Sequence, residues 1–324
     1  PLPIASTQLQ LFNYNLSQLT EKVTATVSTA LTENAIQVFD GGDNQIDEKD
    51  YVLFYAEGAV GWRQDASTFI PTHYKNTSND SVFYFISIGS NGKRMSTMDK
   101  LNSPAQVADQ YDERWLIELD SVSILNSGKL LLGPAMGQGL GKQAKLSYPI
   151  NMNGLVLSSP IKIISRYAAT TYQNPANFNF SINDNAIKTT AVAPISGLLY
   201  DESANISLDS FTYTLNATTN LTSPASVNIS FQADNAAAAG WIDYIELSAK
   251  RKLGFWGTGS FGFRNVSSAL KGNVLQYQIQ NGDAGDYYLN EVYRWPIPLI
   301  YLSTLRKNVG RAKNISQAKK TTKT

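Results

Sequence analysis

The chain has no cysteine and only one histidine, His73, in 324 residues. Without cysteine it can form no disulfide, no thiolate nucleophile and no zinc or iron–sulfur site built on thiolates. A single histidine excludes multi-histidine metal centres and leaves one base for a serine-type triad. The sequence also lacks the G-x-S-x-G elbow that would supply the serine. We therefore expect His73 to be a hydrogen-bonded structural residue.

Charge and long apolar runs are scarce as well. Charged residues make up 16% of the chain and hydrophobic residues 43%, and no run approaches the roughly 18 apolar residues of a transmembrane helix. The net charge is +1, but seven basic residues and no acidic one follow Leu305, so that 20 basic residues face 26 acidic ones in the rest. This balance argues against a core that binds nucleic acid. Residues 306–324 are expected to form a disordered basic tail.

Most of the chain consists of short runs rich in β-branched and aromatic residues, separated by Gly, Asn, Asp and Pro clusters. We predict strands at Val23–Val27, Ile36–Phe39, Tyr51–Tyr55, Val82–Ile88, Arg114–Leu119, Ile161–Ala168, Asn177–Ile182, Ser210–Leu215, Ser226–Ala233, Trp241–Leu247 and Val274–Ile279. Helical periodicity is weak, and the best candidates are Thr7–Glu21 and Ser103–Gln110, which opens with a cap and a proline.

The strand spacing predicts a mainly β fold with two β-sandwich or jelly-roll-like domains and a small C-terminal β segment. Residues 1–110 would be an N-terminal β domain and residues 111–253 a jelly-roll-like sandwich. Residues 254–305 either stand alone or complete the first domain, because about 50 residues make a marginal core. The start at Pro1 without Met or a signal peptide indicates a mature or trimmed form.

The stretch Gly240–Leu253, GWIDYIELSAKRKL, is more particular than a generic strand. Strict alternation predicts one face with Ile242, Tyr244 and Glu246, and another with Trp241, Asp243, Ile245 and Leu247. An unpaired buried carboxylate costs several kcal/mol or takes up a proton. Asp243 therefore needs a polar partner, and we expect it to fix the closure of the sandwich rather than to react.

Two loops carry weak signals for ligands. Five acidic residues between Asp40 and Asp50 provide oxygen ligands of the kind calcium prefers, but their spacing does not fit an EF-hand loop, which favours a solvated turn. The run Gly137–Lys142 resembles a phosphate loop, yet Met136 and Gln143 stand where a Walker A motif needs Gly and Ser or Thr. A flexible connection is the favoured interpretation. We expect no metal or cofactor, with calcium as the alternative.

Aromatic residues could stack on sugar rings if they are exposed, or fill the core if they are not. The candidates are Tyr167, Tyr172, Tyr200, Trp241 and Trp256. The core is favoured for Trp241, and the two interpretations are balanced for Tyr172. As possible ligand contacts we retain Tyr172, Tyr200 and Trp256.

Four groups of residues, in chain order, carry a family resemblance. They are Asp50–Gly58 (DYVLFYAEG) with Trp62, Phe69, His73 and Val82–Phe85; Tyr111–Glu113 with Ser127–Lys129 and Gly133; Gly240–Leu247 with Arg251 and Leu253; and Phe261–Arg264 with Val292 and Tyr293. The set resembles the amino-terminal region of PorU-type sortases of the type IX secretion system. The chain departs from that pattern at Lys129, Leu131 and Pro134, and the pattern stops after Tyr293.

The resemblance implies a non-catalytic region, because the family's cysteine peptidase domain lies after it and a Cys–His dyad cannot exist in a chain without cysteine. No catalytic residue is carried over, and we expect the chain not to be an enzyme. It implies an exported protein at the cell surface or outer membrane of a Bacteroidetes-type bacterium. There it would be a platform that contacts a surface protein or a peptidase module. Trp62, His73, Trp241 and Asp243 are then structural family markers.

The alternative is a surface protein like a carbohydrate-binding module, because a jelly roll with a WIDYIEL-type strand also occurs in sugar-binding sandwiches. Its partner would be a glycan. An enzyme such as a glycosidase is the least favoured, since it needs two carboxylates roughly 5–10 Å apart across a cleft.

Overall fold

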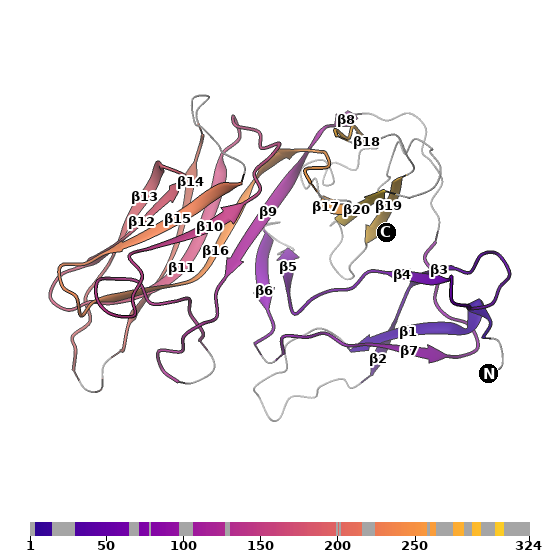
Figure 1. Ribbon diagram of the computed structural model, residues 1–324, viewed down its shortest axis with the longest axis horizontal. Coiled ribbons are helices and arrows are strands. Elements are labelled where there is room, and N and C mark those ends of the chain that lie inside the picture. Colours follow the sequence, from indigo (N-terminus) through magenta and orange to yellow (C-terminus); the bar gives the residue numbers. More distant parts are fainter. Residues whose placement is uncertain are drawn as a thin grey trace, which may run out of the picture. The chain divides into compact units, whose positions relative to one another are not determined.

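The computed structural model describes residues 4–14, 30–64, 71–77, 79–96, 106–126, 130–198, 200, 202–215, 224–257, 260–263, 275–281, 287–292 and 302–307. The chain forms two compact units, residues 1–100 and residues 101–324. Nearly every described element is a strand, which confirms the expected mainly β fold (Figure 1). Within the described residues, no helix is long and apolar enough to cross a membrane.

The first unit is built from short strands. They are β1 (Leu9–Tyr14), β2 (Leu31–Asn34), β3 (Ile36–Phe39), β4 (Tyr51–Phe54), β5 (Val60–Gln64), β6 (Pro71–Lys75) and β7 (Tyr84–Ile88). One sheet has the order β2-β1-β7, and two strand pairs, β3-β4 and β5-β6, accompany it. Leu11 and Ile36 are its buried apolar residues among those described, so the apolar core of this unit is small.

The second unit contains a β-sandwich of two four-stranded antiparallel sheets, β10-β15-β12-β13 and β14-β11-β16-β9. Its strands are β9 (Gln110–Glu118), β10 (Lys145–Ile150), β11 (Ile161–Thr170), β12 (Ala176–Ile182), β13 (Asn185–Val192), β14 (Asn205–Tyr213), β15 (Ala225–Gln232) and β16 (Ala239–Lys252). Further small sheets contain β8 (Gln106–Ala108), β17 (Ser260–Phe263), β18 (Leu275–Tyr277), β19 (Tyr287–Val292) and β20 (Leu302–Lys307).

Alternating apolar side chains fill the space between the two sheets. In β12 every second residue is buried, from Ala176 to Ile182, as period-2 burial requires. Rings from the two sheets pack together, with centroids of Tyr167 and Phe178 4.8 Å apart and those of Phe180 and Phe211 5.4 Å apart. This closely packed core joins the two sheets into one sandwich.

Strand β16 departs from the alternation that the sequence predicts. Its pairing with β11 shifts by one residue, because Arg166 lies opposite Tyr244 and Tyr167 lies opposite Ile242, which leaves Asp243 as an extra residue. Such a β-bulge moves the following side chains to the other face. Ile242 therefore joins Ile245 and Leu247 in the core, and Trp241 lies in a separate cluster with Leu132, Ala168 and Ala239. The predicted grouping of these faces was wrong at the bulge.

The predicted helices are also wrong where they can be compared. Thr7–Glu21 begins as a 3-10 turn, Ser6–Gln8, and continues as β1, with residues 15–21 outside the described residues. In Ser103–Gln110, Gln106–Ala108 is β8, which pairs in parallel with β18. Strand pairing at a distance overrides a weak local preference here. The predicted strand Val23–Val27 lies outside the described residues.

β20 reaches two residues into the predicted basic tail. Arg306 pairs with Ser260 of β17 and with Tyr288 of β19. Residues 308–324, the rest of the tail, lie outside the described residues. The division of the second unit into a sandwich and a separate C-terminal segment stays a prediction.

A polar contact crosses the core between β11, β13 and β14. The Tyr167 hydroxyl lies 2.8 Å from Thr190 Oγ1, and both hydroxyls donate to Asp209 Oδ2. Burial raises the pKa of Tyr167 from 10.0 to about 12. The neutral phenol therefore stabilises the fold fully below about pH 10, and this contribution is lost as the pH rises through about 12.

We expect Tyr167→Phe to lower the free energy of unfolding by about 1 kcal/mol at pH 7. The substitution removes a buried hydroxyl together with its hydrogen bonds to Thr190 and Asp209. The fall in stability between pH 9 and 11.5 should also become shallower, measured by urea unfolding followed by circular dichroism. Thr190→Val is the control, because it removes a partner and leaves the titrating phenol in place. Equal alkaline slopes in the wild type and Tyr167→Phe would contradict this assignment.

Candidate functional site

The outer face of the sheet β14-β11-β16-β9 carries the bulge residue Asp243. Its side chain is 7% exposed and pairs with Arg166 on β11, at 2.8 Å between Nη1 and Oδ2. Arg166 itself is 37% exposed, so its guanidinium also reaches solvent. The bulge directs the Asp243 side chain away from the core, and the expected polar partner is this arginine. The pair fixes β11 and β16 together where their register shifts.

Exposed apolar residues continue from the loop before β14 into the outer face of that strand. We call the four residues Leu198, Tyr200, Ile206 and Leu208 the β14 stretch; they are 74%, 96%, 49% and 66% exposed. Leu208 lies directly opposite Arg166 in the sheet. Phe211 and Tyr213 on the same strand pack against the core instead.

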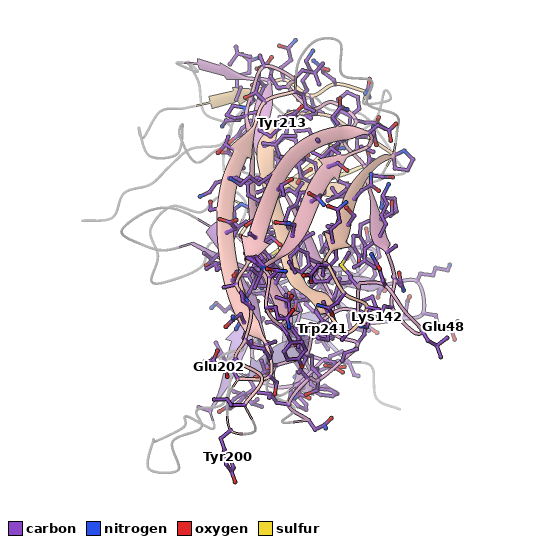
Figure 2. The ribbon with its side chains drawn as sticks, turned by 90° about the vertical axis from the view of Figure 1, so that its left-hand side faces the viewer. Glu48, Lys142, Tyr200, Glu202, Tyr213 and Trp241 are labelled. Carbon is purple, nitrogen blue, oxygen red and sulfur yellow. The ribbon has the colours of Figure 1, made fainter. Side chains whose placement is uncertain are left out.

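In Figure 2, Tyr200 projects away from the body of the sandwich at one end, whereas Tyr213, the last residue of β14, lies at the other end. Of the residues of the β14 stretch, only Tyr200 is among the ligand contacts predicted from the sequence; Ile206 and Leu208 are not. The signal was present, because Ile206 and Leu208 alternate with the polar Ser207 and Asp209. The pattern did not identify the exposed face, since Phe211 and Tyr213 form a second apolar set on the opposite face of the same strand. That face also carries Asp209.

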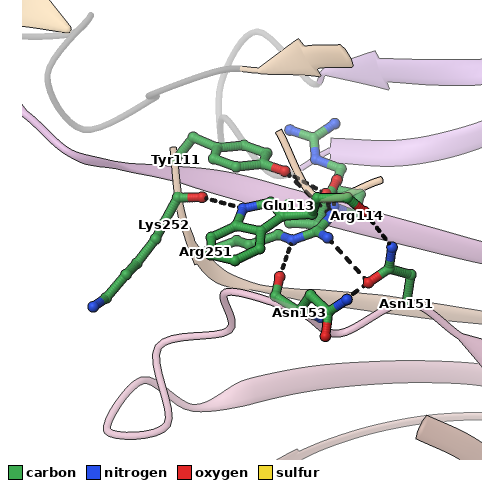
Figure 3. Close-up of polar contacts among 8 residues, drawn as sticks. Tyr111, Glu113, Arg114, Asn151, Asn153, Arg251 and Lys252 are labelled. Carbon is green, nitrogen blue, oxygen red and sulfur yellow. Dashed lines mark hydrogen bonds and ion pairs between the residues drawn. The ribbon is translucent and has the colours of Figure 1, made fainter. Parts of the chain in front are cut away.

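A second polar group lies at the far end of β16 (Figure 3). Arg251, 7% exposed, donates to Glu113 Oε2 at 2.6 Å, to the Asn153 carbonyl at 2.6 Å and to Asn151 Oδ1 at 3.4 Å. Tyr111 also donates to Glu113 Oε2. Burial, followed by the neighbouring Glu113 carboxylate, raises the pKa of Tyr111 well above its usual range. This network joins β9, β16 and the loop after β10.

The three retained aromatics do not come together. Tyr172 and Tyr200 lie in loops at the end of the sandwich where β11 finishes and β14 begins, while Trp256 follows the end of β16. The Trp256 ring packs on Gly154, where an added Cβ would lie 2.3 Å from the ring at a φ of +75°. Its indole N–H donates to the Lys252 carbonyl at 3.0 Å. Trp256 is therefore held by packing.

The other aromatic candidates divide between core and surface. Tyr167 is 1% exposed and lies in the core. Trp241 is 9% exposed, as the core interpretation favoured, and its indole N–H has no hydrogen-bond partner within the described part of the chain. Tyr172 is 40% exposed, and its ring lies against Gly197, whose φ is +72°. Of the five candidates, only Tyr172 and Tyr200 are exposed to solvent over a large part of their surface.

Polar groups lie at the same end of the sandwich as Tyr172. Asn174 donates to Asp234 Oδ2 at 2.5 Å, and Asn235 donates to Asp234 Oδ1 at 3.0 Å. The bond from Asn174 is the main cause that lowers the pKa of Asp234. Lys142 donates to the carbonyls of residues 236, 237 and 238. The glycine-rich run Gly137–Lys142 therefore closes on a neighbouring loop through its lysine.

The residues singled out in the first unit have structural contacts. Trp62 and His73 lie opposite each other in the pair β5-β6, with ring centroids 6.4 Å apart in an edge-to-face arrangement. In the acidic loop, Asp40 accepts from the N–H of Gly42, and Asp47 accepts from the N–H of Lys49. A hydrogen bond from Ser6, then the one from Gly42, lowers the pKa of Asp40. These carboxylates cap turns, as the solvated-turn interpretation expects.

Metal ligands are not grouped in the part of the chain that the structure describes. No three His, Asp or Glu side chains approach one another there as a metal ion would require. What the outer face of the sandwich offers is an apolar stretch beside an ion pair. Grouped exposed apolar residues are typical of interaction sites.

Comparisons with known proteins support the fold. No family model matches the chain, and no curated protein matches it. Among solved structures, a dimeric latent PorU from Porphyromonas gingivalis is similar over 97% of this chain, with a TM-score of 0.66 and 16% identity. The chain spans 31% of the length of that protein. At this identity the likeness is one of fold.

A smaller protein matches more weakly. A carbohydrate-binding module, CBM36 in complex with calcium and xylotriose, covers 37% of this chain and 93% of its own, with 13% identity and a TM-score of 0.23. That similarity is too low to support a comparison of sites. The PorU likeness thus agrees with the resemblance seen in the sequence at the level of fold.

Two neighbouring ion pairs on β16 allow a matched test. Arg251–Glu113 is buried, with side chains 9% and 18% exposed, whereas Lys250–Asp112 is 34% and 26% exposed. We expect Arg251→Met to lower the free energy of unfolding by about 3 kcal/mol, because Glu113 and the Asn153 carbonyl lose a buried donor. Lys250→Met should cost less than about 1 kcal/mol. Urea unfolding measures both, and equal losses would contradict the structural role of the Arg251 network.

Proposed function

We propose that the chain is a non-catalytic module that binds other proteins, and that the β14 stretch on the outer face of its sandwich is the binding surface. The observation that carries this proposal is the exposure of Ile206 and Leu208 on a strand of the sandwich. Exposed apolar residues grouped in this way mark interaction sites. Arg166, half in solvent beside Leu208, adds a charged group at the edge of the apolar surface.

We further propose that the module belongs to an exported protein, at the cell surface or outer membrane, with the architecture of a type IX secretion sortase. The fold likeness to PorU across 97% of the chain supports this proposal, as do the ordered sequence groups. Its partner would be a peptidase module or another surface protein. The absence of cysteine supports a role without thiol catalysis in the chain itself.

The test uses the purified peptidase module of a PorU-type sortase and measures its binding to this chain by calorimetry. We expect Leu208→Asp to raise the dissociation constant at least tenfold, because a charge would be buried against the partner. Ser210→Asp is the control, since it places the same charge on the same face of β14 at a polar position.

Three results would overturn the proposal. The first is no binding by the wild type, and the second is the same loss of affinity in both variants. The third is hydrolysis or transpeptidation of a peptide by the purified chain that a point substitution abolishes. The folded state of each variant is checked by thermal unfolding.

A glycan is the second candidate partner, at the loop end of the sandwich. The observation that favours it is the placement of two exposed rings, Tyr172 and Tyr200, at the same end as the Asn174–Asp234–Asn235 hydrogen bonds. A flat ring beside amide and carboxylate groups suits a sugar, whose faces are apolar and whose edges donate and accept hydrogen bonds.

A glycan array with the purified chain tests this second candidate. If it is correct, Tyr172→Ala and Tyr200→Ala should each weaken the binding of a hit at least fivefold, because each removes one stacking surface. Trp256→Ala should destabilise the fold without changing affinity in the folded fraction, as expected for a ring packed on Gly154. An array without hits would rule the glycan out as a partner.

A further inference from the structure

One end of the sandwich in the second unit carries several loops with exposed apolar side chains. Ala169 of β11 lies there opposite both Asn205, where β14 begins, and Gly240 near the start of β16. Gly240 also exchanges hydrogen bonds with Met136. The loop before Asn205 and the loop after Met136 therefore leave the sandwich at one end, which we call the loop end.

A third loop belongs to the same end. The N–H of Gly133 donates to the Ile242 carbonyl at 2.7 Å, and Val122 forms a β-bridge with Leu132. Val122 and Leu132 are thereby the base of a loop, whose described parts are residues 123–126 and 130–131. Because Ile242 lies close to the start of β16, this loop leaves the sandwich at the loop end as well.

Each of the three loops exposes a large apolar side chain. Leu125 is 61% exposed, Leu140 105% and Leu198 74%. Tyr200 lies on the same loop as Leu198, is 96% exposed and projects from the body of the sandwich (Figure 2). Side chains this exposed add little to the core, so their apolar surface is available to another molecule.

The loop tip that carries Leu140 is fixed in place by the chain itself. The N–H of Lys142 donates to the Gly139 carbonyl at 3.3 Å and closes a four-residue turn, in which Gly141 has the positive φ, +78°, that a type II turn requires at its third position. Lys142 Nζ donates to the carbonyls of residues 236, 237 and 238 at 2.7, 3.2 and 2.8 Å. Since the turn is already held on the sandwich, burying Leu140 costs little conformational entropy.

The tips of these loops carry no charge. Residues 123–126, 137–141 and 193–198 contain no Asp, Glu, Lys or Arg. Of the charged residues described beside the tips, Asp120, Glu202 and Asp234 are acidic, Lys145 is basic, and Lys142 directs its ammonium group to carbonyls. The tips can therefore enter an apolar medium without burying a charge, and they present no basic patch to anionic lipid.

We propose that the loop end binds membranes by inserting Leu125, Leu140 and Leu198 into the surface of a neutral phospholipid bilayer, with Tyr200 at the headgroups. The reason for choosing a lipid is that the three leucines come from separate loops. A protein partner covers one contiguous patch around central anchors, whereas a bilayer accepts apolar side chains that stand apart. Tyrosine suits the headgroup level, because its ring is apolar and its hydroxyl reaches water.

Co-sedimentation of the whole chain with phosphatidylcholine vesicles tests the proposal. We expect the chain to pellet with the vesicles, and Leu140→Asp to lower the partition constant about tenfold, because a carboxylate replaces an inserted apolar side chain. Leu157→Asp is the matched control, since Leu157 is an exposed leucine in the loop before β11, at the opposite end of the sandwich. A wild type that stays in the supernatant, or equal losses in the two variants, would overturn the proposal.

A fluorescent probe measures insertion directly. The chain has no cysteine, so Leu140→Cys and Leu157→Cys each provide a single site for a polarity-sensitive dye. We expect vesicles to shift the emission of the dye at position 140 to shorter wavelength and to leave the dye at position 157 unchanged. Unchanged emission at both positions would reject insertion in favour of a pocket on another protein, and equal shifts at both would reject the loop end as the binding surface.

Salt and lipid charge separate insertion from electrostatic adsorption. Apolar insertion scales with the apolar area buried, so adding phosphatidylglycerol or raising the salt concentration should change the partition constant by less than about twofold. Binding that rises steeply with phosphatidylglycerol and disappears at high salt would contradict insertion of the leucines.

The proposal goes beyond the protein-binding role of the β14 stretch, because Leu125 and Leu140 lie outside that stretch. Leu140→Asp should leave the calorimetric affinity for the peptidase module unchanged, and Leu208→Asp should leave the partition into vesicles unchanged. Failure of one proposal is thereby distinguishable from failure of the other.

Discussion

The sandwich depends on one extra residue in its longest strand. Strand β16 crosses the sheet beside β11 and β9, and the bulge at Asp243 changes which of its side chains face the core. Without that extra residue, alternation would place Ile242 on the opposite face from Ile245 and Leu247. The bulge allows an apolar core on both sides of the shift and directs a carboxylate outward to Arg166. The bulge thus allows a buried strand to contain a charged residue, because the carboxylate lies outside the core and pairs with Arg166.

Polar groups in and around this sandwich are used to fix strands to one another. Arg251 joins β16 to β9 and to the loop after β10, and Tyr167 joins β11 to β13 and β14. Burying such groups costs solvation, which the hydrogen bonds have to offset. What they add is specificity, because each bond forms in a single register. The exposed faces and loops are held in place by this framework.

Exposed apolar residues occur in both units, on β7 in the first and on β14 in the second. They differ in where they lie. On β14 the side chains of Ile206 and Leu208 stand on the outer face of a sheet, where a partner would cover them. On β7 the exposed apolar side chains lie on the last strand of the sheet β2-β1-β7 as the described residues form it.

The sequence by itself determined the class of the fold and many of its strands. Runs rich in β-branched and aromatic residues located β3, β4, β12 and half of β16, because such side chains favour strands. It also determined the absence of thiol chemistry. Composition could not determine the bulge at Asp243, because a register shift depends on the strand opposite, which lies some 77 residues away in the chain.

Only the tertiary structure decided which candidates share a surface. It separated Trp256 from Tyr172 and Tyr200, and it placed Gln106–Ala108, inside the expected helix Ser103–Gln110, in a strand that pairs with β18. It also showed that Ile206 and Leu208 face solvent while Phe211 does not. Strand order, register and exposure are set by contacts between residues distant in the sequence, and a local pattern carries no record of them.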